Sequence, residues 1–150
     1  MNILIFSDSH NSVTPMLRAT REHQPDLILH LGDHDFDTAV LTDAYPYTPI
    51  RAVRGNCDFG SKYALLVNFE VAGKRIVMTH GHRYDVKTDL IPLIRMGQKA
   101  QADLLLFGHT HCTHYEQVDT MHVLNPGSAM KSCALVEIVD GEIFCRHIVL

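Results

Sequence analysis

The sequence lacks the features that would place this protein outside the ordinary globular class. It has no tryptophan, and its four cysteines, Cys57, Cys112, Cys133 and Cys145, form no CxxC pair. A disulfide framework is therefore not predicted. No stretch approaches the roughly 18 apolar residues of a membrane span, and residues 1–6 lack the basic start of a signal peptide. We expect a cytoplasmic protein with reduced thiols and no membrane partner.

An excess of basic residues is also absent. Lysine and arginine total 13 and aspartate and glutamate total 17, so the formal net charge is −4. A protein that binds a nucleic-acid backbone needs a basic face, and here aromatic residues do not alternate with basic ones. No nucleic-acid partner is predicted. A small phosphorylated substrate is compatible with this charge, because bound cations can supply positive charge.

The pattern of apolar runs predicts an α/β protein. A chain of 150 residues forms one domain, residues 1–150, that buries roughly 70% of its unfolded surface. Buried strands at 3–6, 26–31 and 50–54, with a helix from Pro15 to His23 capped by Thr14, predict a parallel layer. Further strands are expected at 65–71, 74–79, 103–107, 113–118, 121–124, 133–139 and 142–149, with a helix within 88–102. The whole predicts two packed sheets with helices outside.

Five of these apolar runs end in side chains that bind metals. The residues are Asp8 and His10 after the first run, Asp33 after the second, Asn56 after the third, His80 after 74–79, and His109 and His111 after 103–107. In α/β sheets, sites form in the crevice beyond the carboxyl ends of strands, where loops hold functional groups on a rigid frame. We therefore expect the five loops to converge.

The converging set contains two carboxylates, one amide oxygen and four imidazoles. Mixed nitrogen and oxygen ligands suit Mn²⁺, Zn²⁺, Fe or Ni²⁺ better than Ca²⁺ or Mg²⁺. Seven ligands are too many for one such ion, whereas two ions that share a carboxylate use all of them. The sequence therefore predicts two divalent metal ions per chain, with Mn²⁺ as the first candidate.

The order of these motifs resembles that of the calcineurin-like metallophosphoesterases. The motifs are Asp8-Ser9-His10, Gly32-Asp33, Gly55-Asn56, His80-Gly81, Gly108-His109-Thr110-His111 and Asn125-Pro126-Gly127-Ser128. The short chain and the Gly55-Asn56-Cys57-Asp58 variant are similar to the small, YfcE-type phosphodiesterase subgroup. The resemblance implies a four-layer α/β/β/α sandwich of two mixed sheets flanked by helices, and hydrolysis of small phosphoesters, most of all phosphodiesters.

The resemblance also implies a role for each ligand. Asp8, His10 and His111 would hold one ion, Asn56, His80 and His109 the other, and Asp33 would bridge them. Asp33, Asn56 and His109 are the residues implied to act in catalysis. A hydroxide between the two ions would attack phosphorus, while the ions neutralise charge on the phosphoryl oxygens.

Cys57 departs from the wider family pattern. Many relatives have a histidine after the Gly-Asn pair, where it contacts the phosphate and helps to protonate the leaving group. A thiol is a weaker hydrogen-bond donor and a poorer acid at neutral pH. We therefore expect a preference for good leaving groups or the use of another donor. By adjacency to His80, the candidates for substrate contact are Cys57, His82 and Arg83.

Other interpretations are left open. A non-catalytic scaffold of the same fold, like the retromer subunit, is the alternative function, but such scaffolds typically lose metal ligands and none is missing here. A single structural zinc site is less favoured, because such sites close with four ligands and favour cysteine. We expect His30 to be a satisfied core residue and leave His34 and Asp35 undecided. The remaining histidines, predicted to be structural or solvated, are His23, His114, His122 and His147. A homo-oligomer is compatible with the sequence.

Overall fold

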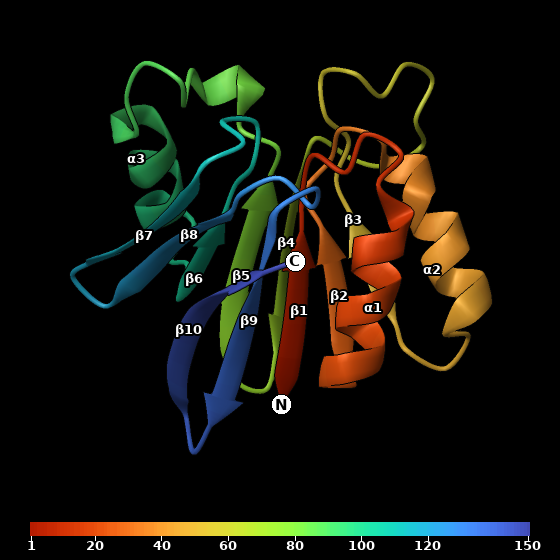
Figure 1. The fold of residues 1–150 in the computed structure, drawn as a ribbon. Coiled ribbons are helices and arrows are strands. Elements are labelled where there is room, and N and C mark those ends of the chain that lie inside the picture. The colour runs from red at the N-terminus through yellow and green to blue at the C-terminus, as the bar shows by residue number, and fades with distance from the viewer.

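Strands and helices alternate in the first part of the chain, and strands dominate its C-terminal part (Figure 1). The computed structural model describes all of residues 1–150. With η marking short 3-10 helices, the elements are β1 (Asn2–Phe6), α1 (Val13–His23), β2 (Leu27–His30), η1 (Asp35–Asp37), α2 (Thr38–Ala44), β3 (Ile50–Ala52), β4 (Leu66–Val71), β5 (Lys74–Thr79), η2 (His82–Tyr84), α3 (Ile91–Lys99), β6 (Leu104–Leu106), β7 (Thr113–Val118), β8 (Met121–Pro126), β9 (Ser132–Val139) and β10 (Glu142–Val149). None of the helices is both long and apolar enough to span a membrane.

The strands form two mixed five-stranded sheets. The first has the order β10-β9-β1-β2-β3, and the second has the order β4-β5-β6-β8-β7. β1, β2 and β3 are parallel to one another, as are β5, β6 and β8. β9 and β10 extend the first sheet in antiparallel pairing, while β4 and β7 do the same for the second. The prediction of two mixed sheets is confirmed.

The two sheets pack face to face around a common core. In β1, Ile3 and Ile5 point into this core, where they join Met78 of β5 and Leu106 of β6. All four side chains are fully buried. Alternate residues of a strand point to opposite faces of its sheet, so the remaining residues of β1 must be covered from the other side.

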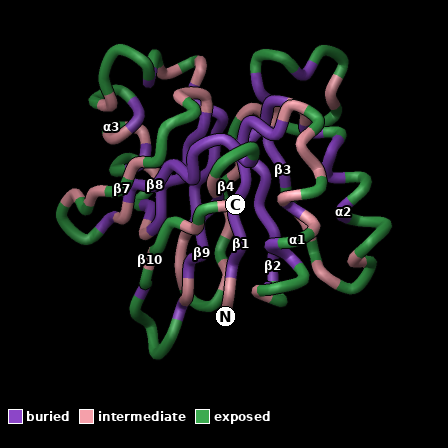
Figure 2. Tube along the Cα trace, viewed as in Figure 1, coloured by how far each residue is buried: buried purple, intermediate pink, exposed green.

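Helices cover that other side of each sheet. Phe6 of β1 belongs to a second core with Met16 of α1 and Leu41 of α2. On the far side of the second sheet, Leu105 of β6 belongs to a third core with Leu93 of α3. Burial on both faces explains why the central strands are continuous apolar runs, and Figure 2 shows the buried residues gathered in them. The predicted α/β/β/α sandwich is confirmed.

Two helices differ from the sequence prediction. α1 begins at Val13 with Ser12 at its N-cap, so the predicted cap at Thr14 with a start at Pro15 is wrong. α2 is absent from the prediction, because its sequence TAVLTDA has three β-branched residues, which have low helix propensity. The burial of Leu41 against β1 and α1 holds this short helix in place, and tertiary packing of that kind has no local sequence signal.

The fold brings the carboxyl ends of β1, β2, β3, β5 and β6 to one edge of the sandwich, at the top of Figure 1. Backbone hydrogen bonds join the loops that follow these strands: Asp8 N–H donates to Gly32 O (2.9 Å) and Gly108 N–H donates to His80 O (3.0 Å). Across the two sheets, His80 Nδ1 donates to Leu31 O (2.7 Å). The predicted convergence of the strand-end loops is therefore present.

Candidate metal centre

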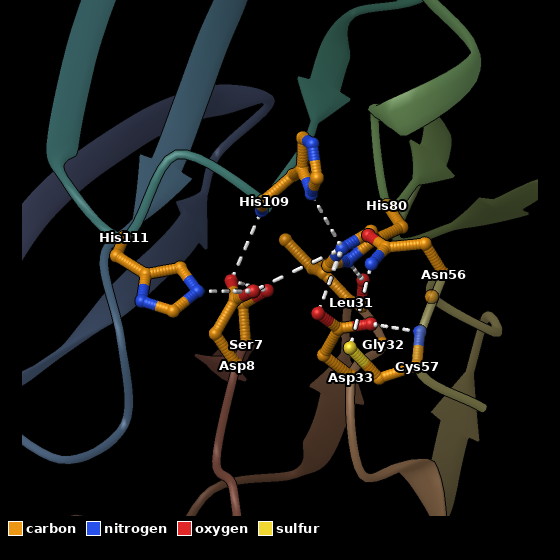
Figure 3. A network of polar contacts seen from close by, with 12 residues as sticks. Ser7, Asp8, Leu31, Gly32, Asp33, Asn56, Cys57, His80, His109 and His111 are labelled. Atoms are coloured by element: carbon orange, nitrogen blue, oxygen red, sulfur yellow. Dashed lines mark hydrogen bonds and ion pairs between the residues drawn. The ribbon is translucent and has the colours of Figure 1, made fainter. Parts of the chain in front are cut away.

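The candidate ligands form two overlapping groups that share Asp33 (Figure 3). In each group, one ligand atom per residue lies within 4.8 Å of the others. The groups are Asp8, His10, Asp33 and His111, and Asp33, His80 and His109. Asn56, the seventh candidate, hydrogen-bonds to the side chain of Cys57, whose backbone N–H donates to Asp33 Oδ1 (Figure 3). The structure thus brings all seven predicted side chains together, and the assignment of each to an ion stays a prediction.

Five of the seven candidate ligands have a left-handed backbone. Their φ angles are 52° at Asp8, 44° at His10, 56° at Asp33, 69° at His109 and 59° at His111. This region is sparsely populated by residues with a Cβ atom, although aspartate and histidine tolerate it better than most. Such strain persists where the surrounding structure enforces it, typically at functional sites. The chain turns sharply at each strand end, and the turn directs a side chain toward the cluster.

Asp8 offers a buried oxygen that has no hydrogen-bond donor. Its Oδ2 accepts from Ser7 Oγ (2.6 Å) and from His109 N–H (3.0 Å). Its Oδ1 is buried without a hydrogen-bond partner and lies 3.2 Å from His111 Nε2 and 3.8 Å from His80 Nε2. A buried carboxylate oxygen is costly without compensation. The surroundings of Oδ1 therefore fit a bound cation.

His80 and His109 turn ring nitrogens toward each other. His80 Nε2 and His109 Nδ1 are 3.2 Å apart. Because His80 Nδ1 donates its proton to Leu31 O, the neutral ring has its lone pair at Nε2, toward His109 and Asp33. Metal-binding histidines are oriented in this way, through a backbone carbonyl at the other ring nitrogen. The pair fits a cation held between the two rings.

The protonation states of His109 and Asp33 favour cation binding. Burial, together with the charges of His80 and Lys87, lowers the pKa of His109 to about 4. Burial by itself would raise the pKa of Asp33, but hydrogen bonds from His80 and Cys57 hold it well below its usual range. Burial by itself would lower the pKa of His80, but the hydrogen bond to Asp33 and the charge of Asp8 raise it above its usual value. A neutral imidazole and an ionised carboxylate are metal-binding forms, and a proton on His80 would leave on metal binding.

The loop after β3 orients Asp33. Cys57 N–H donates to Asp33 Oδ1 (2.9 Å), while Asp33 Oδ2 lies 3.5 Å from His80 Nε2. Asn56 Nδ2 donates to Cys57 Sγ (3.4 Å), which leaves its amide oxygen free to act as a ligand. Burial raises the pKa of the Cys57 thiol, and its hydrogen bond with Asp33 raises it further. Cys57 is thus a neutral thiol at neutral pH, consistent with the expected weak acid.

His34 lies beside the first group of ligands. His10 Nε2 and His111 Nε2 are 3.5 Å apart, and the ring of His34 lies 5.0 Å from that of His10. His34 Nδ1 is buried without a hydrogen-bond partner. Asp35, by contrast, accepts a short hydrogen bond from Ser61 Oγ and belongs to neither ligand group. The sequence leaves the roles of His34 and Asp35 open, and the structure distinguishes them. His34 borders the cluster, whereas Asp35 holds the loop that contains Ser61.

Asp58 is a supporting residue whose role the sequence does not predict. Its Oδ2 accepts from the N–H groups of Asp33 (2.9 Å) and Gly55 (2.6 Å), and its Oδ1 accepts from those of His34 (2.6 Å) and Asp35 (3.1 Å). One carboxylate thus joins the loop after β2 to the loop after β3. Most of these contacts span more than twenty residues, so the sequence contains no signal for them beyond the presence of Asp58 in the Gly55–Asp58 motif.

His30 is a satisfied core residue, as predicted. Its Nδ1 accepts from Gly32 N–H (3.2 Å), so its Nε2 carries the proton and donates to Ser9 Oγ (3.1 Å). Ser9 Oγ in turn donates to Asp37 Oδ2 (2.7 Å), which also accepts from Asn11 N–H. Burial lowers the pKa of His30 to about 4. This chain of hydrogen bonds fixes the loop that presents Asp8 and His10.

Two glycines allow the loops to approach closely. A Cβ atom at Gly55 would collide with the side chain and backbone nitrogen of Asp33. A Cβ atom at Gly108 would collide with Ser7 Oγ and lie 3.0 Å from Asp8 Oδ2. Glycine is required at both positions by the space that Asp33 and Asp8 occupy.

The turn at Asn125–Ser128 supports the same edge of the fold. Asn125 Nδ2 donates to Gly108 O and Thr110 Oγ1, both at 3.0 Å. Ser128 Oγ donates to Asp8 O (2.8 Å). This turn borders the cluster without contributing a candidate ligand. The histidines expected to be structural or solvated lie in neither ligand group; they are His23, His114, His122 and His147.

A cavity of about 420 Å³ opens next to the cluster and includes Asn56, His82 and Arg83 in its walls. The ring of His82 lies 5.5 Å from that of His80 and 6.1 Å from that of His109. Burial lowers the pKa of His82, and the charge of His80 lowers it further. His82 and Arg83 thus line a cavity beside the cluster, and their contact with a substrate stays a prediction.

Known proteins share this sequence pattern. Residues 1–140 match the family model of the calcineurin-like phosphoesterase superfamily domain. "Probable metallophosphoesterase YsnB" of Bacillus subtilis is 31% identical over 131 residues, which cover 85% of this chain and 75% of that protein. "Phosphodiesterase YfcE" of Escherichia coli is 33% identical over 86 residues, 51% of this chain and 42% of that protein.

Solved structures share the fold. A predicted phosphoesterase of Streptococcus pneumoniae has a TM-score of 0.80 and 26% identity, and the match covers 99% of this chain and 88% of that one. Wild-type Vps29 of Entamoeba histolytica in complex with zinc has a TM-score of 0.74 and 20% identity, with 99% of both chains covered. The likeness to Vps29 shows the fold alone.

The family match and its named relatives define a metal-dependent phosphoester hydrolase. The chain belongs to the calcineurin-like phosphoesterase superfamily, and its resemblance to the YfcE-type phosphodiesterases is confirmed. Membership implies divalent metal ions, for which the two ligand groups around Asp33 are the candidate site.

Proposed function

We propose that this protein is a phosphodiesterase with a dinuclear metal centre. One ion is held by Asp8, His10 and His111, the other by Asn56, His80 and His109, and Asp33 bridges them. The observation that carries this proposal is the buried Asp8 Oδ1, which has no donor and faces imidazole nitrogens. The sharing of Asp33 by both ligand groups supports the bridge.

The bound ions would supply the hydroxide nucleophile predicted from the sequence and would neutralise the negative charge on the phosphoryl oxygens. The chain's own residues position them. Cys57 N–H fixes the Asp33 carboxylate, so that its second oxygen faces His80. Leu31 O fixes the tautomer of His80. Among the ligands, Asp33, Asn56 and His109 are the proposed catalytic residues.

Proton supply to the leaving group sets the expected substrate preference. The raised pKa of Cys57 makes its thiol a poor acid at neutral pH. Two other polar side chains, His82 and Arg83, line the cavity beside the cluster and are proposed substrate contacts together with Cys57. We infer that esters with good leaving groups, such as p-nitrophenolate, are hydrolysed fastest.

Mn²⁺ is the proposed native metal, and Zn²⁺, Fe and Ni²⁺ also suit the mixed nitrogen and oxygen ligands. Hydrolysis of bis-p-nitrophenyl phosphate, measured with and without Mn²⁺ after treatment with EDTA, tests the proposal. The Asp33→Ala variant should lose activity, because it lacks the bridge between the ions. Near-normal rates in that variant would show that the two-metal assignment is wrong.

A non-catalytic scaffold is the second candidate function, because the fold is also that of Vps29. The complete ligand set of this chain argues against the scaffold, since none of the seven predicted ligands is missing. Metal binding alone does not separate the two functions, because the solved Vps29 itself holds zinc. Turnover separates them: well-folded protein with no hydrolysis under any of the four metals would favour the scaffold.

We further propose that residues 1–150 form a single cytoplasmic domain that acts on small phosphoesters rather than nucleic acids. The four free cysteines support a reducing compartment. Exposed Phe144 and Val149 on the edge strand β10 support self-association into a homo-oligomer. Cell fractionation tests the location, and sedimentation analysis tests the oligomeric state.

A further inference from the structure

The cavity beside the candidate metal centre carries two guanidinium groups, one from each sheet. Arg54 and Arg83 both line it. Arg54 follows β3 of the first sheet, and its backbone N–H donates to Ala64 O (3.0 Å), which closes the loop between them. Arg83 lies in η2, directly after β5 of the second sheet. Two separate strand-end loops therefore each contribute an arginine to the same cavity.

Neither guanidinium has a partner within the protein. The arginine ion pairs of the chain belong to Arg75 and Arg146, and the side-chain hydrogen bonds donated by arginine all come from Arg75. The carboxylate in the cavity wall, Asp58, is already occupied by four backbone N–H groups. The cavity thus has two uncompensated positive charges in a chain whose net charge is −4.

The cavity borders the candidate metal centre. Asn56, a proposed ligand, and His82, which neighbours His80 and His109, both line it. Phe59, also in its wall, is 95% exposed and presents an aromatic face to solvent. A small molecule bound at the metals would therefore have beside it a space lined by Arg54, Arg83 and Phe59.

We propose that this cavity binds a second phosphate group of the substrate, so that the preferred substrates are small phosphodiesters that carry a further phosphate. Arginine recognises phosphate through its planar fork of N–H donors, and two forks can bind one phosphate from different sides. The ring of Phe59 would contact the organic part that links the two phosphates. This inference rests on the proposed phosphodiesterase function and names its substrate class.

Two p-nitrophenyl esters that differ in one phosphate test the proposal. They are thymidine 5′-(p-nitrophenyl phosphate) and its 3′-phosphorylated form, assayed with Mn²⁺ by release of p-nitrophenolate. Charge-assisted hydrogen bonds from two arginines predict a kcat/KM about 10- to 100-fold higher for the phosphorylated ester. The Arg54→Gln and Arg83→Gln variants should each lower this ratio by about 10-fold.

Arg95→Gln is the matched control, because it removes the same charge from an exposed position on α3. Arg95→Gln should keep the wild-type ratio of the two kcat/KM values. If it lowered this ratio as much as the cavity variants do, the effect would come from overall charge. Circular dichroism confirms that each variant is folded. A ratio near one in the wild-type protein, or an unchanged ratio in both cavity variants, overturns the proposal.

A binding measurement separates this inference from the proposed function. Isothermal titration calorimetry compares thymidine 3′,5′-bisphosphate with thymidine 5′-monophosphate on the wild-type and variant proteins. The bisphosphate should bind about 10-fold more tightly, and Arg54→Gln should remove the difference. If no ester is hydrolysed, the phosphodiesterase proposal fails, and this affinity difference still decides whether the cavity selects a second phosphate. Equal affinities contradict the inference directly.

Discussion

Replacing Asp8 with asparagine should remove at least half of the metal-dependent stability while it leaves the fold intact. The amide oxygen can still accept from Ser7 Oγ and His109 N–H, as Asp8 Oδ2 does. The amide nitrogen then takes the place of Oδ1, the buried oxygen that has no donor and faces His111. An NH₂ group at that point offers no lone pair and no negative charge to a cation. The variant therefore loses the ion held with His10 and His111.

The magnitude follows from ligand linkage. At a free Mn²⁺ concentration 100 times its Kd, each occupied site stabilises the protein by about 2.7 kcal/mol. In a chain of this length that corresponds to a rise in Tm of roughly 5–10 °C per site. The wild-type protein, with both sites filled, should show about twice the shift of a protein that retains one. Because Asp33 couples the two sites, Asp8→Asn should keep half of the wild-type shift or less.

Differential scanning calorimetry in EDTA and in excess Mn²⁺ measures this shift. Asp119→Asn, a substitution of the same type at an exposed turn between β7 and β8, is the control and should keep the full shift. In EDTA, Asp8→Asn should unfold within about 2 kcal/mol of the wild-type protein, the cost of one unsatisfied buried amide. A full metal-dependent shift in Asp8→Asn would refute the assignment of Asp8 as a ligand.

Three further substitutions follow from the same geometry. Cys57→Ser should change kcat/KM by less than about 10-fold, because the thiol is a poor proton donor; a loss near 1,000-fold, the scale of a general acid, would contradict this. Gly108→Ala should destabilise the protein by about 1–3 kcal/mol in urea melts, because its Cβ would meet Ser7 and Asp8; an unchanged midpoint would show that the loop yields. Burial lowers the pKa of His30 from 6.5 to about 4. Between these pH values the unfolded state binds a proton at His30 and the folded state does not, so the metal-free protein should lose stability as the pH falls from 6.5 to about 4. His30 should account for about 3 kcal/mol of this loss in the free energy of unfolding. If a His30→Gln variant lost the same amount of stability over this pH range, the loss would come from another group.

The parts of the fold that depend on local sequence pattern are predictable from the chain alone. Ile3, Ile5 and their neighbours in β1 are buried on both faces, so their apolar run identifies a central strand. Each candidate ligand follows such a strand, and parallel strands end at one edge of a sheet. That rule is sufficient to predict that Asp8 lies near Asp33.

The features that the sequence does not reveal depend on contacts distant in the chain. Asp58 supports the loops after β2 and β3 through hydrogen bonds to Asp33, His34, Asp35 and Gly55. Nothing in the local pattern distinguishes it from a solvated turn residue. Arg54 is equally inconspicuous, because its importance arises from a cavity that it shares with a residue on the other sheet.

The stoichiometry of metal activation tests the dinuclear phosphodiesterase most directly. Metal-free protein is titrated with Mn²⁺, and hydrolysis of bis-p-nitrophenyl phosphate is followed at each addition. If two ions clamp the phosphoryl group, activity should rise to a plateau at about two equivalents of Mn²⁺ per chain, and Asp33→Ala should show no such rise. Full activity at one equivalent, or folded protein with no turnover under Mn²⁺, Zn²⁺, Fe²⁺ or Ni²⁺, would contradict a two-metal phosphodiesterase.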